Sequence, residues 1–192
     1  MKYIIEHLEP ELWEWCMIEY EHISEIVGRE NLIFTNVKSK KDADMLKGLG
    51  AVHEKNVSES DFGRICVLSQ YAEKTLATND KNNFDAVIFG GILGDNPAKK
   101  RTENIINDLK KSGKTFEERN LGKLQMPTDN AIYAVKKIFD GKKLSDFKFA
   151  DKMEIEINDS ESVELDFRYI IDNNKPVISE KLVEYLRNKE DF

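Results

Sequence analysis

Short apolar runs alternate along this chain with longer segments whose apolar residues recur every three to four positions. The short runs predict strands at residues 2–6, 31–35, 64–68, 85–89 and 116–119. The longer segments predict helices at residues 9–27, 42–47, 97–112 and 128–139. Strands that alternate with helices are typical of a parallel sheet covered by helices. We therefore expect an α/β fold with a parallel or mostly parallel sheet.

Single residues mark some of the predicted helix boundaries. Gly28 follows a stripe of apolar positions that ends at Val27, and glycine is suited to end a helix. Thr128 stands at the start of another stripe, where its hydroxyl could cap the helix.

After residue 140 the pattern changes from alternating helices and strands to mostly strands. The predicted elements there are a strand with one face in water at residues 153–157, a long strand at 163–171, a turn at Asn173-Asn174 and a helix at 179–188 capped by Ser179. We expect one domain with a core at residues 1–147, on which residues 148–192 pack as a short β-hairpin and a helix.

Charge is distributed unevenly along the chain, which has a net charge of −7. Residues 98–148 hold 13 basic and 7 acidic side chains, whereas the segments on either side are acidic. The basic segment indicates either a surface that faces an anion or a pair of solvated, lysine-rich helices. The overall acidity disfavours a protein that grips nucleic acid with its whole surface.

Other features concern the cellular compartment. No apolar run approaches the roughly 18–20 residues of a membrane span, and the first residues lack the pattern of a signal peptide. The chain has two cysteines, Cys16 and Cys66, each inside an apolar pattern. We therefore expect buried, reduced thiols and a cytoplasmic protein without membrane contact.

The strongest local signal is the loop Phe89-Gly90-Gly91-Ile92-Leu93-Gly94-Asp95, directly after an apolar strand. Its glycines permit positive φ angles and let a ligand approach the backbone amides. A glycine-rich loop at the carboxyl end of a parallel strand is a common place for nucleotide binding in α/β proteins. The spacing matches neither G-x-G-x-x-G nor a P-loop, so neither NAD nor ATP follows. A tight turn without a ligand is the alternative.

A second loop, residues 119–129, also leaves a predicted strand and enters a predicted helix. The amides at that helix N-terminus could face a polar ligand, although an ordinary helix start explains the pattern too. Both loops should face the same edge of the sheet. Arg101 and Arg119, two of only six arginines, lie in or near these segments. Their guanidinium groups could grip a carboxylate or phosphate, or form surface ion pairs.

Several ionisable residues belong to the first strand and helix. Glu6 and His7 end the first strand and should lie at the same sheet edge, and Glu19 borders the apolar stripe of the first helix. Solvated or helix-stabilising roles are the alternative for both acids. His7, His22 and His53 lack the spacing of a zinc site, so no metal is expected. No G-x-S-x-G elbow is present either.

These residues resemble a SPOUT-class family of archaeal and eukaryotic proteins. The resemblance spans nearly the whole chain and lies in Met1 to His7, Trp15, Glu19-Tyr20, Phe89 to Asp95, Arg101-Thr102, Leu121-Gly122, Gln125-Met126, Thr128-Asp129, Ala131-Ile132 and Phe167-Arg168-Tyr169. Archaeal members are described as S-adenosylmethionine (SAM)-dependent RNA methyltransferases. The fungal member is a protein arginine methyltransferase that acts on a small-subunit ribosomal protein.

The resemblance implies a SPOUT-type α/β fold with a deep C-terminal trefoil knot, whose loops bind SAM as the co-substrate. It also implies a monomer, as for the fungal relative, or a homodimer formed through the knot. The expected SAM contacts are Phe89, Gly90, Gly91, Ile92, Leu93, Gly94, Arg119, Leu121, Gly122, Gln125, Met126 and Thr128. The expected substrate contacts are His7, Arg101 and Asp129.

Three functions fit the sequence. The favoured one is methylation of an arginine in a ribosomal protein, with Glu6, Glu19 and Asp95 as candidate catalytic acids that orient the guanidinium and help a proton leave. An acidic enzyme suits a basic ribosomal protein. The second is methylation of rRNA or tRNA, in which residues 98–148 would contact phosphates. The third is a SAM- or nucleotide-binding protein that regulates a partner without catalysis.

Overall fold

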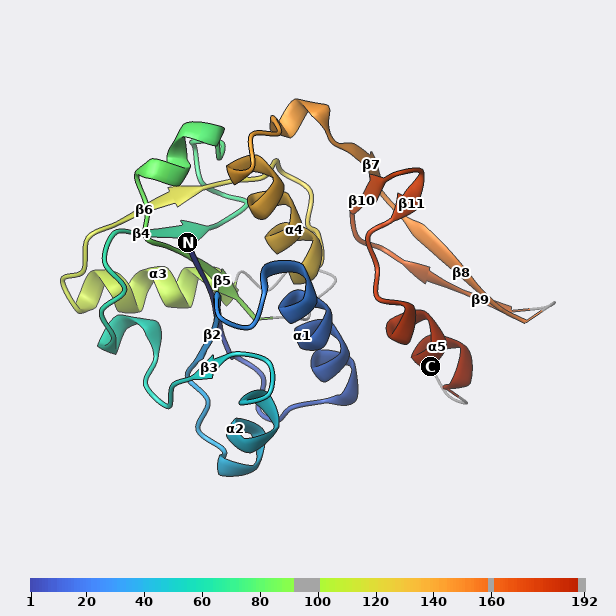
Figure 1. Cartoon of the computed structure of the whole chain (residues 1–192), viewed down its shortest axis with the longest axis horizontal. Coiled ribbons are helices and arrows are strands. Elements are labelled where there is room, and N and C mark those ends of the chain that lie inside the picture. Colours follow the sequence, from blue (N-terminus) through green and yellow to red (C-terminus); the bar gives the residue numbers. More distant parts are fainter. Residues whose placement is uncertain (92–100, 159–160, 190–192) are drawn as a thin grey trace.

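The computed structural model describes residues 1–91, 101–158 and 161–189, and Figure 1 shows its elements. The helices are α1 (Glu14–Val27), α2 (Lys40–Leu46), α3 (Arg101–Lys111), α4 (Thr128–Phe139) and α5 (Glu180–Asn188). The strands of the main sheet are β1 (Lys2–Glu6), β2 (Leu32–Thr35), β3 (Ala51–Val52), β4 (Ile65–Leu68), β5 (Ala86–Gly90) and β6 (Phe116–Arg119). The later strands are β7 (Lys148–Ala150), β8 (Met153–Asn158), β9 (Glu161–Leu165), β10 (Tyr169–Asp172) and β11 (Lys175–Pro176).

The main sheet has the order β3-β2-β1-β5-β4-β6, and every neighbouring pair in it is parallel. This confirms the predicted parallel sheet. The predicted strands reappear within one or two residues of their expected ends. The two-residue strand β3 was not predicted, because a run this short carries no periodicity.

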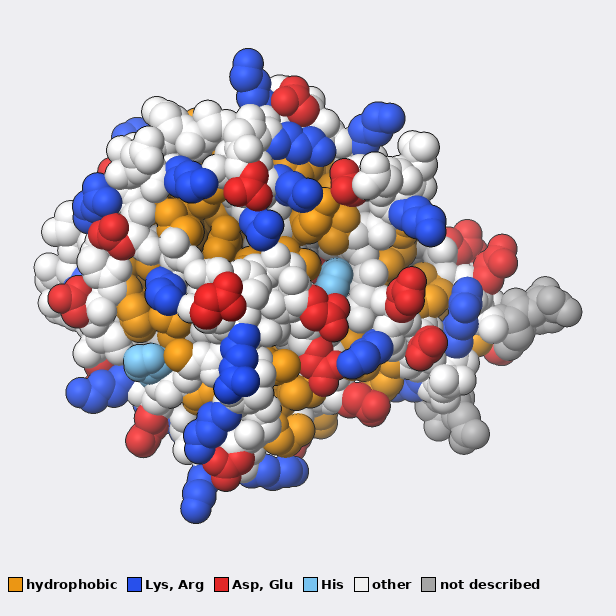
Figure 2. Space-filling model, viewed as in Figure 1, with side chains coloured by type: hydrophobic (Ala, Val, Ile, Leu, Met, Phe, Trp, Pro, Cys, Tyr) orange, Lys and Arg blue, Asp and Glu red, His pale blue; other side chains and the backbone are white. Residues whose placement is uncertain are grey.

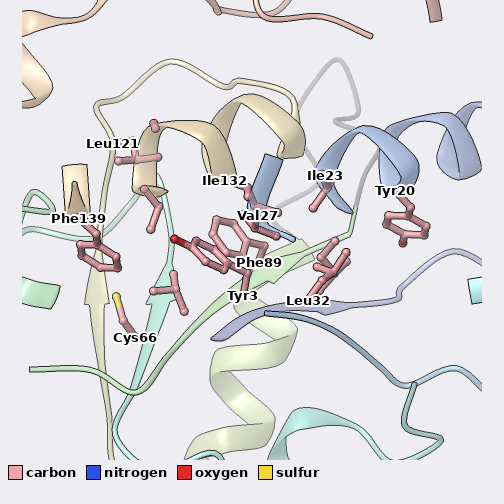
Figure 3. Packing of buried hydrophobic residues seen from close by; sticks show 14 of the residues in the cluster. Tyr3, Tyr20, Ile23, Val27, Leu32, Cys66, Phe89, Leu121, Ile132 and Phe139 are labelled. Carbon is pink, nitrogen blue, oxygen red and sulfur yellow. The ribbon is translucent and has the colours of Figure 1, made fainter. Parts of the chain in front are cut away.

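Alternation along the strands sends side chains to two separate apolar layers. Tyr3 and Ile5 of β1 pack on the side that carries α1 and α4, whereas Ile4 packs on the side that carries α3. Figure 3 shows the first layer, in which Phe89 of β5 meets Ile132 of α4 beneath the two helices. Strands that are buried on both faces explain why these runs are almost continuously apolar.

The first helix is shorter than predicted. It begins at Glu14, and residues 9–13 form a loop instead. Leu12 still packs against the core from this loop, so the apolar spacing alone could not show where the helix begins. The other end is confirmed: Gly28, with φ of +81°, follows the last helical residue, and its N–H donates to the Ser24 carbonyl at 2.9 Å.

The C-terminal residues build smaller antiparallel sheets, and a third apolar cluster joins them to α1. β10 pairs with β7 and β11, while β8 pairs with β9. The cluster contains Ile18 of α1, Tyr169 of β10 and Leu186 of α5, all buried. In Figure 1, β8 and β9 extend away from the main sheet, and α5 returns beside α1. The turn predicted at Asn173-Asn174 is confirmed by its positive φ angles.

The single long strand predicted at residues 163–171 is wrong, because the run is divided between β9 and β10. At the break, the Arg168 N–H donates to the carbonyl of Gln125 at 2.9 Å, and its guanidinium donates to Asp151 at 2.7 Å. These partners lie far away in the sequence, so the local β propensity could not reveal the interruption. Ser179 does precede α5, but its side chain makes no capping bond there.

Candidate functional site

The two predicted loops meet at the carboxyl edge of the main sheet. Glu6, the last residue of β1, is paired in register with Gly90 of β5, and the Gly91 N–H donates to the Glu6 carbonyl at 3.1 Å. The Thr128 hydroxyl at the start of α4 donates to the Gly91 carbonyl at 2.6 Å. Thr128 therefore joins the second loop to the first. Its predicted role as a helix cap is wrong, because Pro127 occupies the cap position.

Glycine is required at the start of the first loop. Gly91 has φ of +69°, a conformation that side chains with a Cβ rarely adopt. A Cβ at Gly90 would lie 3.0 Å from Oγ1 of Thr102 in α3, so this helix packs tightly against the end of β5. The Phe89 side chain is buried in the core, which leaves only its backbone for a ligand. Ile92, Leu93, Gly94 and Asp95 lie outside the described residues.

The second loop is held in place by the segment after β4. The Asn120 side chain donates to the Ala72 carbonyl at 2.9 Å, and the Asn120 carbonyl accepts from the Leu76 N–H at 3.0 Å. Gly122 has φ of +99°, and its N–H donates to Oδ1 of Asn120 at 2.9 Å. Leu121 packs into the core. Backbone groups with fixed directions are what a polar ligand needs.

Gln125 and Met126 form the next part of the second loop. The Gln125 carbonyl is the acceptor that interrupts the C-terminal strand run, and the half-buried Met126 packs against the main core. The loop therefore contacts both the main sheet and the C-terminal strands.

Arg119 forms a buried ion pair rather than a free anion-binding group. Its Nε and Nη2 atoms donate to the two carboxylate oxygens of Asp80 at 3.0 and 2.9 Å. Each side chain is 7% exposed. Glu117 lies 2.9 Å from Nη2, and the Phe84 ring lies under the guanidinium. These hydrogen bonds hold the pKa of Arg119 well above its usual value. Only the backbone of Arg119 is left to line the loop.

Arg101 also forms an ion pair. Its guanidinium donates to the carboxylate of Glu9 in the loop before α1. This pair joins the start of α3 to the segment that follows β1. The sequence left open a surface ion pair for each arginine; both side chains do form ion pairs, but that of Arg119 is buried.

Glu6 and His7 point to opposite faces of the sheet, because they are neighbours at a strand end. The Glu6 carboxylate accepts from the Thr35 hydroxyl and from the Val57 N–H, the latter at 3.0 Å. Burial raises the pKa of Glu6, although these hydrogen bonds oppose the shift. His7 shares a 2.9 Å hydrogen bond with the Tyr20 hydroxyl of α1, and burial lowers its pKa. The two residues therefore do not form one catalytic pair.

Glu19 and Asp129 come together between α1 and α4, although 110 positions separate them in the sequence. Glu19 is 3% exposed and Asp129 is 1% exposed. Burial and the nearby Asp129 charge raise the pKa of Glu19 well above its ordinary value. Asp129 follows Thr128 directly, so this acid pair lies beside the joined loops.

Two residues of this cluster were not predicted from the sequence. Nδ1 of His22 lies 2.8 Å from Oδ2 of Asp129. The side-chain amide of Asn130 donates to Asp129, and its Oδ1 accepts from the Ile170 N–H at 2.8 Å. The second bond joins α4 to β10. The position of His22, three residues after Glu19, places both on one side of α1 and is a signal that could have pointed to it.

Metal-binding clusters and membrane spans are both absent from the described residues. No group of three or more His, Cys, Asp or Glu side chains there is arranged to hold a metal ion. No helix among the same residues is both long and apolar enough to cross a membrane.

Comparison with known proteins identifies relatives of this chain. Residues 2–191 match the family described as "Protein arginine N-methyltransferase SFM1-like". The Saccharomyces cerevisiae protein arginine N-methyltransferase SFM1 is 35% identical over 97% of this chain and 94% of its own length. The crystal structure of the yeast enzyme with SAM has a TM-score of 0.87 at 34% identity, covering 97% of this chain and 89% of that one.

A more distant likeness concerns the fold alone. The crystal structure of a dual-specific Trm10 from Thermococcus kodakaraensis has a TM-score of 0.58 at 17% identity, covering 75% of this chain and 95% of that one. Both likenesses agree with the parallel sheet and with the SPOUT resemblance. The chain belongs to the SFM1-like family of protein arginine N-methyltransferases.

Proposed function

We propose that this chain is a SAM-dependent methyltransferase that acts on an arginine side chain of a protein. One structural observation carries the proposal: the Thr128 hydroxyl joins the two loops at the carboxyl edge of the sheet, through the carbonyl of Gly91. Family membership over residues 2–191 supports it. Structures of the yeast relative with SAM, SAH and MTA support SAM as the co-substrate.

The residues at this edge suit SAM. Gly91 offers a backbone approach, since, its chain neighbours aside, the nearest atom of the described residues to a Cβ there would be Cβ of Leu8 at 3.7 Å. We assign SAM contacts to the backbone of Phe89, Arg119 and Leu121, whose side chains are engaged elsewhere, and to Gly90, Gly91, Gly122, Gln125, Met126 and Thr128. Ile92, Leu93 and Gly94 belong to this assignment on the sequence argument alone.

We also propose the trefoil knot of the SPOUT class. The support is the set of hydrogen bonds by which residues 119–123 are held within the segment that follows β4. The Ser69 N–H donates to the Arg119 carbonyl at 2.9 Å, and the Lys74 carbonyl accepts from the Asn120 N–H at 2.8 Å. If the chain continues from these hydrogen-bonded residues into α4 on the opposite side of the segment after β4, it is threaded through that segment.

The chemistry needs little beyond alignment and control of one proton. SAM supplies a methyl group on a sulfonium. A nitrogen–carbon bond forms as the carbon–sulfur bond breaks, and the electron pair of the broken bond stays on sulfur. The guanidinium also loses one proton. Because a guanidinium has a pKa above 12, a carboxylate beside it has to orient it and accept that proton. We assign this role to Glu19 and, on the sequence argument, to Asp95.

Glu6 has a supporting position in this assignment. Its carboxylate already accepts hydrogen bonds from Thr35 and Val57 on the α3 side of the sheet. The first bond joins the ends of β1 and β2, and the second joins β1 to the segment after β3, next to Gly90. His7, Arg101 and Asp129 remain our assigned residues on the substrate side.

A basic protein is the substrate that the surface suits. Figure 2 shows acidic side chains gathered over the region of α1 and α5, and Glu14, Glu25 and Glu184 there are exposed. This surface attracts basic partners and suits a ribosomal protein. We propose that the enzyme works in the cytoplasm, which the buried free thiols Cys16 and Cys66 suit, and that it acts as a monomer or as a knot-mediated homodimer.

The test uses methyl-labelled SAM and ribosomes from cells that lack this enzyme. Label in a ribosomal protein, recovered after hydrolysis as methylarginine, is the expected result. Label in RNA would instead support the second function, to which the basic residues 98–148 point. SAM binding without transfer to either fraction would support a non-catalytic, regulatory protein.

A further inference from the structure

A buried acid pair lies at the α1–α4 contact, and neither of its members is among the assigned SAM contacts. The two carboxyl groups have very different surroundings. Oδ2 of Asp129 lies 2.8 Å from Nδ1 of His22. Oδ1 of Asp129 accepts from the N–H and the side-chain amide of Asn130, at 2.6 and 3.0 Å. Hydrogen bonds to both oxygens favour the charged form of a carboxyl group. Both carboxylate oxygens of Asp129 therefore have hydrogen-bond partners.

Glu19 lacks this support. Oε1 accepts one bond, from Nε1 of Trp15 at 2.9 Å, whereas Oε2 is buried and, in the described part of the chain, has no hydrogen-bond partner. A buried oxygen without a partner is rare in native proteins and points to a ligand. Burial and the Asp129 charge raise the pKa of Glu19 well above its ordinary value, which favours the neutral form of this carboxyl group.

Three other titratable groups among the described residues face Glu19. The titratable groups that face Glu19 from α1 are Cys16 and Tyr20, and Tyr169 faces it from β10. Burial raises the pKa of the Cys16 thiol to about 12 and raises the pKa of both tyrosines, so all three stay neutral. His22 lies against Asp129 instead, with Nδ1 2.8 Å from Oδ2.

We propose that Glu19 gives up a proton when the substrate arginine binds, so that the guanidinium cation takes the place of that proton. This inference rests on the proposed function and specifies how the same site takes its substrate. Oε2 is the free acceptor for a guanidinium N–H. An arriving cation compensates the negative charges of both Glu19 and Asp129, which a neutral ligand could not do.

Glu19 loses a proton when the substrate binds and regains one during methyl transfer. One proton leaves Glu19 for solvent as the guanidinium binds. During transfer the guanidinium nitrogen passes its own proton to the Glu19 carboxylate as the new nitrogen–carbon bond forms. Glu19 is then neutral again, and a neutral acid holds the methylated cation less tightly, which favours product release. The single proton that the overall reaction produces therefore appears at substrate binding rather than at methyl transfer.

The test is a binding measurement with methylguanidinium chloride as the probe and SAH in the SAM site. Titration calorimetry in buffers of different ionisation enthalpy counts the protons released. We expect about one proton per site, and an apparent affinity that strengthens about tenfold per pH unit while Glu19 is protonated. Infrared difference spectra should show the band of a protonated carboxyl group disappearing as the probe binds.

Three variants test whether Glu19 is the source of the released proton. Glu19→Gln replaces a neutral acid with a neutral amide of the same shape, so it should fold, bind the probe more weakly and release no proton. Asp129→Asn should move proton release to lower pH. Glu54→Gln, which changes an exposed acid after β3, should behave as the unchanged protein. Absence of probe binding, binding without proton release, or the same release from Glu19→Gln would overturn the inference.

The ribosome labelling experiment keeps the two proposals apart. Transfer of label to protein arginine together with pH-independent probe binding would refute the proton exchange and leave the proposed function standing. Absence of label in protein would refute the proposed function itself.

Discussion

Replacing Asp80 with asparagine should lower the free energy of unfolding by about 3 kcal/mol, because the Arg119 charge would then lie buried without its main partner. Breaking a buried ion pair commonly costs about 3–5 kcal/mol. We expect the lower end, since Glu117 remains 2.9 Å from the guanidinium and is about half exposed to water. For a chain of this size the melting temperature should fall by roughly 6–12 °C.

A double-mutant cycle in urea measures this pair. Asp80→Asn and Arg119→Met should each be destabilising, and the double variant should be about as stable as either single variant, because it contains no uncompensated charge. Additive effects would refute the ion-pair argument. Titration of the folded variants with SAM tests the site: Arg119→Met should bind SAM within a few-fold of the original protein. A hundredfold loss in that variant would show that the guanidinium itself contacts SAM.

The same pair predicts a pH dependence. Burial raises the pKa of Asp80, but hydrogen bonds from Arg119 and from the Ala77 N–H outweigh it and leave the pKa lowered. A lowered carboxyl pKa contributes stability that is complete above the unfolded value, about 4, and is lost as pH falls through the folded value. The stability gap between the original protein and Asp80→Asn should therefore close on acidification, which urea unfolding between pH 3 and about 6 can follow.

Three further changes test the site. Gly91→Val should abolish SAM binding in calorimetry because of its positive φ, whereas Gly113→Val, equally strained but in open space, should lower stability and leave SAM binding intact. Thr128→Val should weaken SAM binding roughly tenfold by removing the bond to Gly91, and an unchanged affinity would refute the joining role of that bond. Glu6→Gln should flatten the pH dependence of unfolding. Because the Glu6 pKa is raised, the acid contributes stability below its unfolded value that disappears as pH rises through the folded one, and an unchanged profile would count against this.

The meeting of the two candidate loops at one sheet edge was predictable from the sequence, whereas the contacts of their side chains were not. Parallel strands bring their carboxyl ends to one edge, so Glu6, Gly91 and Arg119 had to end near each other. The partner of Arg119, however, is Asp80 in the segment between β4 and β5. Nothing in the local pattern around either residue indicates that pairing.

The contacts of the acid pair, Glu19 and Asp129, also could not be predicted from the sequence. Glu19 was selected from the sequence because it borders an apolar stripe, and Asp129 because of the family resemblance. The link from Asp129 to His22 spans 107 positions and exists only because α1 packs against α4. Likewise, the hydroxyl of Thr128 suited a helix cap on local grounds but donates to Gly91.

The sequence by itself determined most strands of the main sheet, most helix boundaries and the parallel character of the sheet, because these follow from short-range periodicity and from single residues such as Gly28. Tertiary structure decided the strand order β3-β2-β1-β5-β4-β6, the division of residues 163–171 and the raised pKa of Glu19. Burial and charge at one residue depend on neighbours that are distant in the sequence. Packing alone brings those neighbours together, and it therefore sets which groups are charged and which are free to bind.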